Sequence, residues 1–465
     1  MTEPNATSTT RQTARDKLPA RALGPTSRNS EGPAYCVWEL TLRCDLGCQH
    51  CGSRAGRARA DELRTDECLD VVRQLAEAGV REVTLIGGEA YLRDDWQQIA
   101  AAIVRSGMVC NMTTGARNLT DERVQQAVDA GMRSVSISLD GIGATHDAQR
   151  GSRGSYDAAM AACARVAASS LVLTNNSQIN RLSLPELPAM ARALASVGSR
   201  AWQIQLTVPM GNAADRPAVL LQPFELRTLF PLLVWIDETL LAPADILLAA
   251  GNNVGYFGPY ESKLRLGGRR GAHWNGCSAG RRTIALEADG TVKSCPSLNR
   301  DDYGGGSVRE RSLADALTQA PMQRLQRRTP ADLWGFCQGC YYAETCLAGC
   351  SWTSHVLLGR PGNNPYCIHR AMDHDRRGLR ERLVPVRAAP GVPFDNGVFA
   401  IEVEPVSAGS DTADGTILGL PREQVLGWRP DQGSIHDPTT LTHVLQLGAL
   451  VQPGLRRQAI NTPKR

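Results

Sequence analysis

Between residues 34 and 211 the chain alternates short apolar runs with longer stretches in which apolar residues recur every three or four positions. The short runs predict buried strands. The longer stretches predict amphipathic helices, such as the one with Cys68, Val71, Val72 and Leu75 on one face. Six strand–helix units in succession indicate a parallel sheet joined by right-handed crossovers. The predicted strands are 36–42, 82–86, 108–112, 134–139, 171–178 and 201–208.

The rest of the chain lacks this alternation. It begins with a polar stretch rich in Thr, Ser, Arg and Pro, and it ends with one rich in Pro, Gly and Asp. We therefore expect a disordered tail at 1–32, a strand–helix domain at 33–213, a helical bridge and loop at 214–273, a cysteine-rich domain at 274–383 and a loosely structured C-terminal extension at 384–465.

Composition narrows the class of protein. The 465 residues suffice for two or three domains, and a net charge of 51 − 47 = +4 gives no basic footprint for nucleic acid. The longest apolar run, 229–236, is too short to span a membrane, and the N-terminus lacks a signal-peptide pattern. Fourteen cysteines without an export signal indicate metal or redox use in a reducing cytoplasm. We expect a cytoplasmic protein that binds neither nucleic acid nor membrane.

Three cysteines with the spacing C-x3-C-x2-C follow the first predicted strand: Cys44, Cys48 and Cys51. A structural zinc ion or a closed iron–sulfur cubane takes four protein ligands. Three thiolates on one loop can hold a [4Fe–4S] cube by three corners and leave its fourth iron open to a small molecule. The loop follows the C-terminal end of a strand, where α/β barrels carry their chemistry. A zinc knuckle is the alternative interpretation.

This cysteine loop resembles the signature of the radical S-adenosylmethionine (SAM) enzymes, which directly follows the first barrel strand in that family. The resemblance implies that the open iron binds the amino and carboxylate groups of SAM. One electron from the cluster then cleaves the S–C5′ bond and yields a 5′-deoxyadenosyl radical. The resemblance also implies an α/β fold with a partial (β/α)6 TIM-like barrel, in place of a full barrel or a doubly wound sheet.

Two further patterns fit a SAM site. Gly87, Gly88 and Glu89 directly follow the second strand and resemble the family's G-G-E-P motif, although Ala90 stands in place of Pro. The resemblance implies that the Glu89 carboxylate accepts a hydrogen bond from the SAM amino group. The two glycines permit a close approach of the backbone to a ligand.

The second pattern lies at the end of the fourth strand, with Ser138 and Asp140 followed by Arg150. The resemblance implies that these three residues contact the ribose and the methionine carboxylate. The alternative is that they cap a loop. No catalytic proton donor or acceptor is assigned.

Seven later cysteines match the spacing of the SPASM extension that follows many radical SAM barrels. This resemblance implies two auxiliary [4Fe–4S] clusters, so three clusters in all. The implied ligands of a closed auxiliary cluster are Cys337, Cys340, Cys346 and Cys367. Those of the other, without an assigned fourth ligand, are Cys277, Cys295 and Cys350. A zinc site at 337–350 is the alternative.

The pattern from Trp38 to Arg370 resembles SPASM-containing maturases of ribosomally made peptides, including a subgroup that excises a tyramine fragment. The resemblance implies hydrogen abstraction from a precursor peptide, then backbone excision or crosslinking. Implied partners are that peptide, a flavodoxin- or ferredoxin-type reductant and a separate leader-binding protein. Two alternatives stay open: a radical enzyme acting on a redox-cofactor precursor or another non-peptide substrate, and a non-catalytic iron–sulfur electron-transfer protein.

Overall fold

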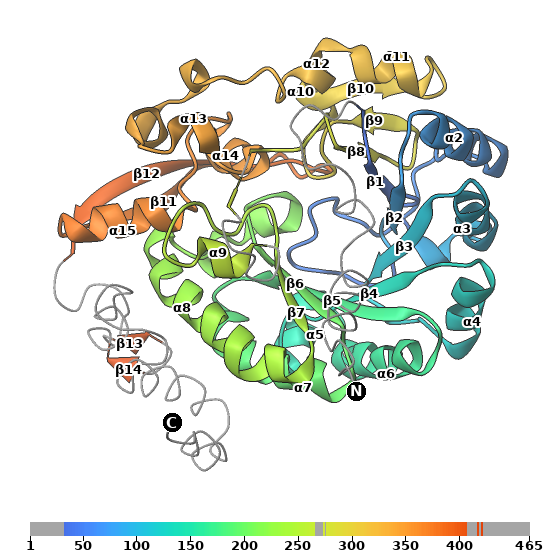
Figure 1. Cartoon of the computed structure of the whole chain (residues 1–465), viewed down its shortest axis with the longest axis horizontal. Coiled ribbons are helices and arrows are strands. Elements are labelled where there is room, and N and C mark those ends of the chain that lie inside the picture. The colour runs from blue at the N-terminus through green and yellow to red at the C-terminus, as the bar shows by residue number, and fades with distance from the viewer. Residues whose placement is uncertain (1–31, 266–272, 275, 407–415, 418–419, 422–465) are drawn as a thin grey trace, which may run out of the picture.

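A computed structural model describes residues 32–265, 273–274, 276–406, 416–417 and 420–421 of the chain. Its centre is a 10-stranded sheet that bends into a partial barrel, with helices on the outside (Figure 1). The strand order is β10-β9-β8-β1-β2-β3-β4-β5-β6-β7. The first seven strands are β1 (Tyr35–Glu39), β2 (Glu82–Ile86), β3 (Val109–Thr114), β4 (Ser134–Ser138), β5 (Val172–Ile179), β6 (Ala201–Leu206) and β7 (Leu247–Ala250).

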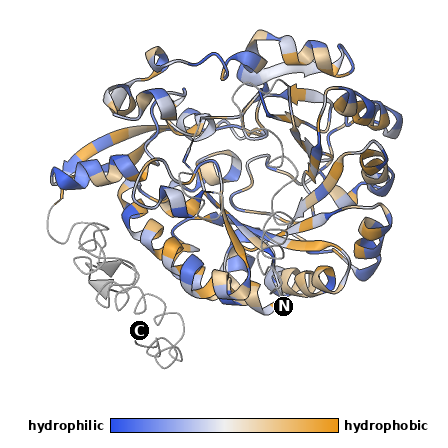
Figure 2. Ribbon diagram, in the orientation of Figure 1, coloured by the Kyte–Doolittle hydropathy of each residue, from blue (hydrophilic) through white to orange (hydrophobic). Residues whose placement is uncertain are grey.

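Helices connect these parallel strands and place their apolar faces toward the sheet (Figure 2). In α2 the predicted stripe of Cys68, Val71, Val72 and Leu75 is buried, and this burial holds the helix to the sheet. The helices of this part are α2 (Thr65–Glu77), α3 (Trp96–Arg105), α4 (Asp121–Asp129), α5 (Ala144–Arg150), α6 (Ser155–Ala168), α7 (Leu187–Ser196) and α8 (Leu226–Ile236).

The six predicted strand–helix units form the partial barrel. Each strand from β1 to β5 pairs in parallel with the next, so the predicted (β/α)6 fold is confirmed. Strand β7 adds a seventh parallel strand beside β6. The predicted helical bridge at 214–273 therefore also contains a strand, whose short sequence Leu-Leu-Ala-Ala carries no period-two alternation.

The cysteine-rich segment continues the barrel sheet. Strand β8 (Thr283–Leu286) pairs in parallel with the free side of β1, and β9 (Thr291–Lys293) and β10 (Gly304–Ser307) follow antiparallel. One core cluster runs from α2 through β1 to residues of these strands. The remaining helices are α9 (Glu261–Leu264), α10 (Arg300–Tyr303), α11 (Leu313–Thr318), α12 (Ala320–Gln323), α13 (Ala343–Cys346), α14 (Ser351–Leu358) and α15 (Ile368–Arg376).

The C-terminal extension begins with an ordered hairpin, which differs from the loose structure expected over 384–465. Strands β11 (Leu379–Arg387) and β12 (Val398–Pro405) pair antiparallel and pack on α14 and α15. Their apolar residues join the second core cluster, and the connecting loop holds Pro390, Gly391, Pro393 and Gly397. A short pair, β13 (Thr416–Ile417) and β14 (Leu420–Pro421), follows. The predicted tail up to residue 31 and the rest of the extension lie outside the described residues.

Pro217–Ala244, which contains α8, is the one stretch in the described part of the chain that is long and apolar enough to cross a membrane. Inside the fold, 78% of its most apolar window is buried. It therefore packs as a core helix of the barrel wall. After α8 it continues as a π-helical turn, Asp237–Leu241.

Candidate active site

The three cysteines after β1 share one loop and are free of disulfide bonds. Cys44 and Cys51 each accept a backbone N–H at 3.4 Å, and Cys48 accepts a guanidinium N–H of Arg150 at 3.6 Å. N–H donors of this kind stabilise thiolates and tune the potential of iron–sulfur clusters. Burial raises the pKa of Cys44 to about 12 and that of Cys48 to about 11, so cluster loading releases protons. The donor set fits three corners of a cubane.

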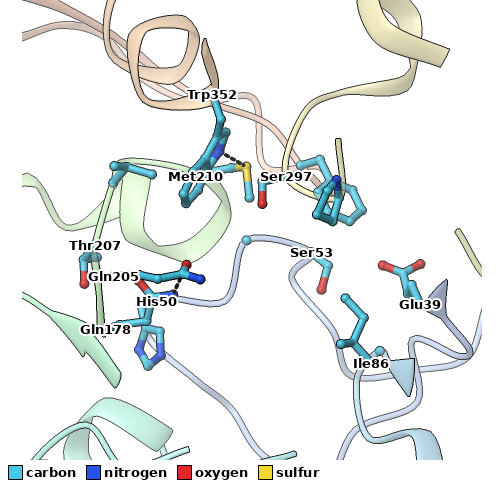
Figure 3. Close-up of a pocket in the computed structure, with 15 residues that line it drawn as sticks. Glu39, His50, Ser53, Ile86, Gln178, Gln205, Thr207, Met210, Ser297 and Trp352 are labelled. Carbon is cyan, nitrogen blue, oxygen red and sulfur yellow. Dashed lines mark hydrogen bonds between the residues drawn. The ribbon is translucent and has the colours of Figure 1, made fainter. Parts of the chain in front are cut away.

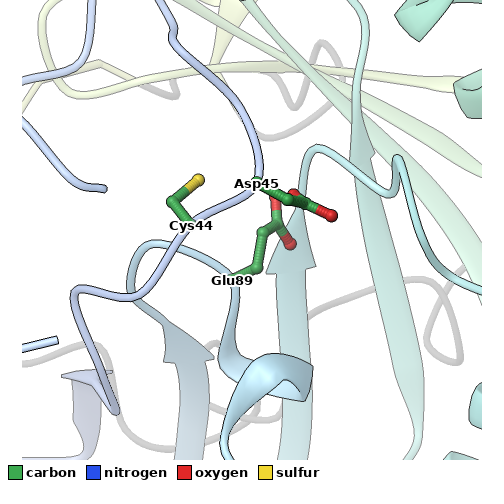
Figure 4. Close-up of side chains that lie close together, drawn as sticks. All are labelled: Cys44, Asp45 and Glu89. Atoms are coloured by element: carbon green, nitrogen blue, oxygen red, sulfur yellow. The ribbon is translucent and has the colours of Figure 1, made fainter. Parts of the chain in front are cut away.

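Glu89 lies beside this loop and is only 2% exposed. Ligand atoms of Cys44, Asp45 and Glu89 all lie within 4.8 Å of one another (Figure 4). The Glu89 carboxylate accepts the Gly115 N–H at 2.7 Å and the Thr114 hydroxyl. Burial raises the pKa of Glu89 to about 7, although both hydrogen bonds oppose the rise. The end of β3 thus fixes the position of Glu89 next to the first cysteine.

The two glycines before Glu89 allow the turn after β2 to lie directly against the cysteine loop. A Cβ atom on Gly87 would lie 2.2 Å from the carbonyl oxygen of Thr41, and one on Gly88 would lie 2.2 Å from that of Arg43. No side chain fits at either place. The glycines therefore set the distance between Glu89 and the cysteines, and their contact with SAM stays a prediction.

Asp140 joins two side chains at the rim of the site. Its carboxylate lies 2.5 Å from the guanidinium of Arg150 and 3.1 Å from Nε2 of His50. Burial alone would raise the pKa of Asp140, but Arg150 and His50 hold it below its ordinary value. Ser138 is buried nearby, and its hydroxyl accepts the Asn176 amide at 2.9 Å. The structure brings all three predicted residues of this region together, and their contacts with SAM stay a prediction.

A cavity of about 190 Å³ opens between the first cysteine loop and the cysteine-rich segment (Figure 3). One side carries His50 and Ser53, which flank Cys51 in the sequence. The opposite side carries Ser297 and Trp352, which lie two residues beyond Cys295 and Cys350 respectively. The cavity therefore lies between the first cysteine loop and the predicted ligand group of Cys277, Cys295 and Cys350.

The cavity wall combines polar and apolar groups. Gln178 and Gln205, at the ends of β5 and β6, join by an amide hydrogen bond of 3.4 Å. Opposite them, the Trp352 indole N–H donates to the Met210 sulfur at 3.1 Å. Glu39, the last residue of β1, is the one carboxylate among the lining residues, and burial raises its pKa. Apolar walls with a few placed polar groups are typical of sites for organic substrates.

The loop of the C-terminal hairpin completes the cavity wall. Phe394 lines the cavity, and its backbone N–H donates to the Gly52 carbonyl at 3.0 Å. The adjacent Asp395 pairs with Arg54 at 3.0 Å, and Arg54 also pairs with Asp215 at 2.7 Å. The tip of the hairpin is thus tied to the segment that directly follows the first cysteine loop.

Four of the later cysteines line a second cavity: Cys337, Cys340, Cys346 and Cys367. Four thiols facing one space match the ligand number of a closed cubane. Backbone N–H groups of Tyr342 and Asn364 donate to two of the sulfur atoms at 3.4 Å each. Phe257 and Tyr342, stacked at 4.3 Å between ring centroids, form part of the apolar wall. This cavity fits the predicted closed cluster.

The other three cysteines form a separate group. Cys295 interacts electrostatically with Cys277 and Cys350, and burial raises its pKa to about 12. No further cysteine lies between Cys277 and Cys295 in the sequence. The group therefore offers three thiols, as the first loop does.

Two protein-family models match the chain in the order of these cysteine groups. The model of the radical SAM superfamily matches residues 38–177, and that of the SPASM iron–sulfur cluster-binding domain matches residues 277–341. The chain thus contains a radical SAM domain followed by a SPASM domain. The first match contains the cysteine loop and Glu89, and the second contains four of the seven later cysteines.

Named relatives cover most of this radical SAM chain. An AdoMet-dependent heme synthase from Methanosarcina barkeri is 27% identical over 73% of the chain and 98% of its own length. The mycofactocin maturase MftC from Mycobacterium tuberculosis is 28% identical over 78% of the chain and 90% of its own length. The structure of Streptococcus suis SuiB bound to the precursor peptide SuiA superposes with a TM-score of 0.53 at 15% identity, covering 74% of this chain and 76% of that chain. The last comparison shows a shared fold.

Several residues of the radical SAM site were not singled out in the sequence. A signal for Glu39 was present, because a carboxylate ends an otherwise apolar strand. His50 lies between two ligand cysteines, and Trp352 lies two residues after another. Phe394 gave no signal, because it reaches the cavity only through the fold of the hairpin.

Proposed function

We propose that this protein is a radical SAM peptide maturase that abstracts hydrogen from a ribosomal precursor peptide. The cavity between the Cys51 loop and the loops of Cys295 and Cys350 carries the proposal, because a peptide side chain placed there lies between two cluster sites. The relative named as a mycofactocin maturase and the neighbour solved with its precursor peptide support a peptide substrate. Backbone excision or crosslinking would follow abstraction.

SAM and its cluster, when bound, supply a 5′-deoxyadenosyl radical that removes a hydrogen atom from an unreactive C–H bond. The residues of the chain bind and orient SAM and the substrate, and they exclude water from the site. The Glu89 carboxylate would accept a hydrogen bond from the amino group of SAM, and Gly87 and Gly88 hold Glu89 against the cysteine loop. Ser138 and Arg150 would contact the ribose and the carboxylate of SAM, while Asp140 fixes the guanidinium of Arg150.

We propose three [4Fe–4S] clusters. The auxiliary clusters would take up the electron that remains after hydrogen abstraction, or orient the substrate. The ligands of the radical cluster are Cys44, Cys48 and Cys51. Those of the closed auxiliary cluster are Cys337, Cys340, Cys346 and Cys367. Those of the remaining cluster are Cys277, Cys295 and Cys350.

Three further expectations belong to this function. A flavodoxin- or ferredoxin-type protein supplies the electron for SAM cleavage. A separate protein binds the leader of the precursor peptide. The reaction takes place in the cytoplasm, where thiols stay reduced before they bind iron.

Anaerobic coexpression with each small open reading frame beside the gene, followed by mass spectrometry of the peptides, tests the peptide substrate. We expect one peptide to change mass with the natural chain and to stay unchanged with Cys44→Ala. A large mass loss indicates excision, and a loss of two hydrogens indicates crosslinking. Unchanged peptides, from cells in which the reduced enzyme still forms 5′-deoxyadenosine, would contradict a peptide substrate.

The heme synthase relative favours a second candidate, a radical enzyme acting on a non-peptide substrate such as a redox-cofactor precursor. The cavity of about 190 Å³ is smaller than the roughly 300–1,000 Å³ of pockets for small organic ligands. It suits one inserted side chain better than a porphyrin. Formation of 5′-deoxyadenosine that is stimulated by an iron porphyrin, and by none of the peptides, would select this second candidate.

A further inference from the structure

Arg328 lies between the two groups of SPASM cysteines. Its guanidinium donates to the Ser351 hydroxyl and to the Leu347 carbonyl, each at 2.7 Å. Ser351 directly follows Cys350, and Leu347 directly follows Cys346. One side chain therefore holds the short segment that runs from Cys346 of the four-thiol group to Cys350 of the three-thiol group.

The positive charge of Arg328 has no ion-pair partner in the described part of the chain. Both acceptors of its hydrogen bonds are neutral, and its buried Nε has no hydrogen-bond partner. Burial lowers the pKa of Arg328, and Cys277 exerts the strongest opposing attraction. Asp332, Tyr303 and, most weakly, Cys337 of the other group also attract it. The guanidinium thus interacts with one cysteine of each group.

Arg328 is half-buried, and a cation withdrawn from water is costly unless an anion compensates it. Cysteines that bind iron do so as thiolates, so the two loaded groups would place negative charge near Arg328. The hydrogen-bond acceptors of Arg328 are neutral, so loaded clusters would add negative charge that these hydrogen bonds do not supply.

We propose that Arg328 raises the reduction potentials of the auxiliary clusters and thereby makes them better electron acceptors. The inference rests on the auxiliary clusters of the proposed function. Reduction adds one electron, and so one negative charge, to a cluster. A fixed cation in a region of low dielectric favours the more negative state. Arginine stays protonated in proteins, so Arg328 acts as a constant charge and transfers no proton.

The chain contains a matched control beside this residue. Arg327 is exposed and donates to Gln323 on the surface. Replacing either arginine by glutamine removes one positive charge from the same short segment. Only the replacement of Arg328 removes it from between the cysteine groups. Arg328→Lys keeps the charge but loses the planar fork of donors.

The test is an anaerobic potentiometric titration of the full-length, iron-loaded protein, followed by electron paramagnetic resonance. At a fixed potential we expect Arg328→Gln to lower the ratio of reduced to oxidised auxiliary cluster at least tenfold, which is 59 mV for a one-electron couple. Arg328→Lys and Arg327→Gln should each change the ratio less than tenfold. The radical cluster, recognised because its signal changes when SAM is added, should keep its potential.

Equal shifts in Arg328→Gln and Arg327→Gln would overturn the inference, as would an equal shift of the radical cluster. If Arg328→Gln fails to bind iron, Arg328→Lys and Ser351→Ala test the inference in its place. Both variants keep the positive charge at residue 328 and disturb its hydrogen bonds. A tenfold change in either then overturns the inference, and unchanged ratios support it. Natural protein that shows the radical cluster but no auxiliary signal would overturn the auxiliary clusters themselves.

Discussion

Glu89 is positioned before any ligand binds, because Gly115 and Thr114 hold its carboxylate beside Cys44. Glu89→Gln keeps the shape of the side chain and removes its charge. A hydrogen bond to a charged group contributes about 1.5–3 kcal/mol. We therefore expect SAM to bind roughly 10- to 100-fold more weakly, measured by the SAM-induced change in the signal of the reduced radical cluster.

The control for this substitution is Glu122→Gln on the exposed face of α4, which should leave SAM affinity unchanged. Equal affinity in the two variants would show that Glu89 does not bind the amino group.

The residues of the radical site could be predicted only where their chemistry is local. Cys44, Cys48 and Cys51 lie on a single loop, and Glu89 lies on a single turn with its two glycines. Both patterns are therefore visible in short stretches of sequence. The role of Thr114 depends on β3 lying beside β2, and that of Phe394 depends on a contact with Gly52. Contacts between distant segments leave no local pattern, which is why these two residues were missed.

At the scale of elements, the C-terminal hairpin is held at its tip by the ion pair of Arg54 and Asp395, which is largely buried. Removing the Asp395 charge leaves Arg54 paired with Asp215, so the loop loses its ionic contact with Arg54. We expect Asp395→Asn to raise amide hydrogen exchange at residues 391–396 and 52–54, with β11 and β12 unchanged. Mass spectrometry of the exchanged protein measures this effect.

Val392→Ala provides the matched control for the hairpin, because Val392 is 54% exposed on the same loop. It should leave exchange at residues 52–54 unaltered. A tip that stays protected in Asp395→Asn would mean that the ion pair does not hold the loop on the cavity.

The π-helical turn after α8 contains Asp237, whose pKa burial raises to about 6. Neighbouring Glu238 adds to the rise, and Lys263 opposes it. Because the pKa of Asp237 is raised in the folded state, folding disfavours the charged form of this carboxyl group. The neutral carboxyl group therefore favours folding at low pH, and this contribution to stability is lost as the pH rises through 6. Because Asp237 is partly exposed, solvent screening limits this contribution to the free energy of unfolding to about 1–2 kcal/mol.

We therefore expect Asp237→Asn to be more stable than the natural chain at pH 8, by about 1–2 kcal/mol, with a smaller difference at pH 5. Thermal unfolding at the two pH values measures it. A difference that does not grow between pH 5 and pH 8 would contradict the buried-charge explanation.

At the scale of the whole molecule, the ten cysteines that we propose as ligands form three groups, one at the barrel and two in the SPASM segment. Replacing the cysteines of any one group by alanine should lower bound iron by about one third, because each group would hold one four-iron cluster. Loss of the first group should also abolish 5′-deoxyadenosine formation by the reduced protein. Loss of either later group should leave some of that activity.

Iron analysis and chromatography of the reaction products measure these outcomes. A variant without the first group that still cleaves SAM would contradict the assignment of the radical cluster.

Strand β1 has no free edge: it pairs with β2 on one side and with β8 on the other. A fragment that ended before β8 would expose the backbone N–H and C=O groups of an apolar strand, and such edges recruit other chains. The radical half alone should therefore self-associate during expression. Dissecting this protein calls for point substitutions in the intact chain, because a truncation would test solubility instead of chemistry.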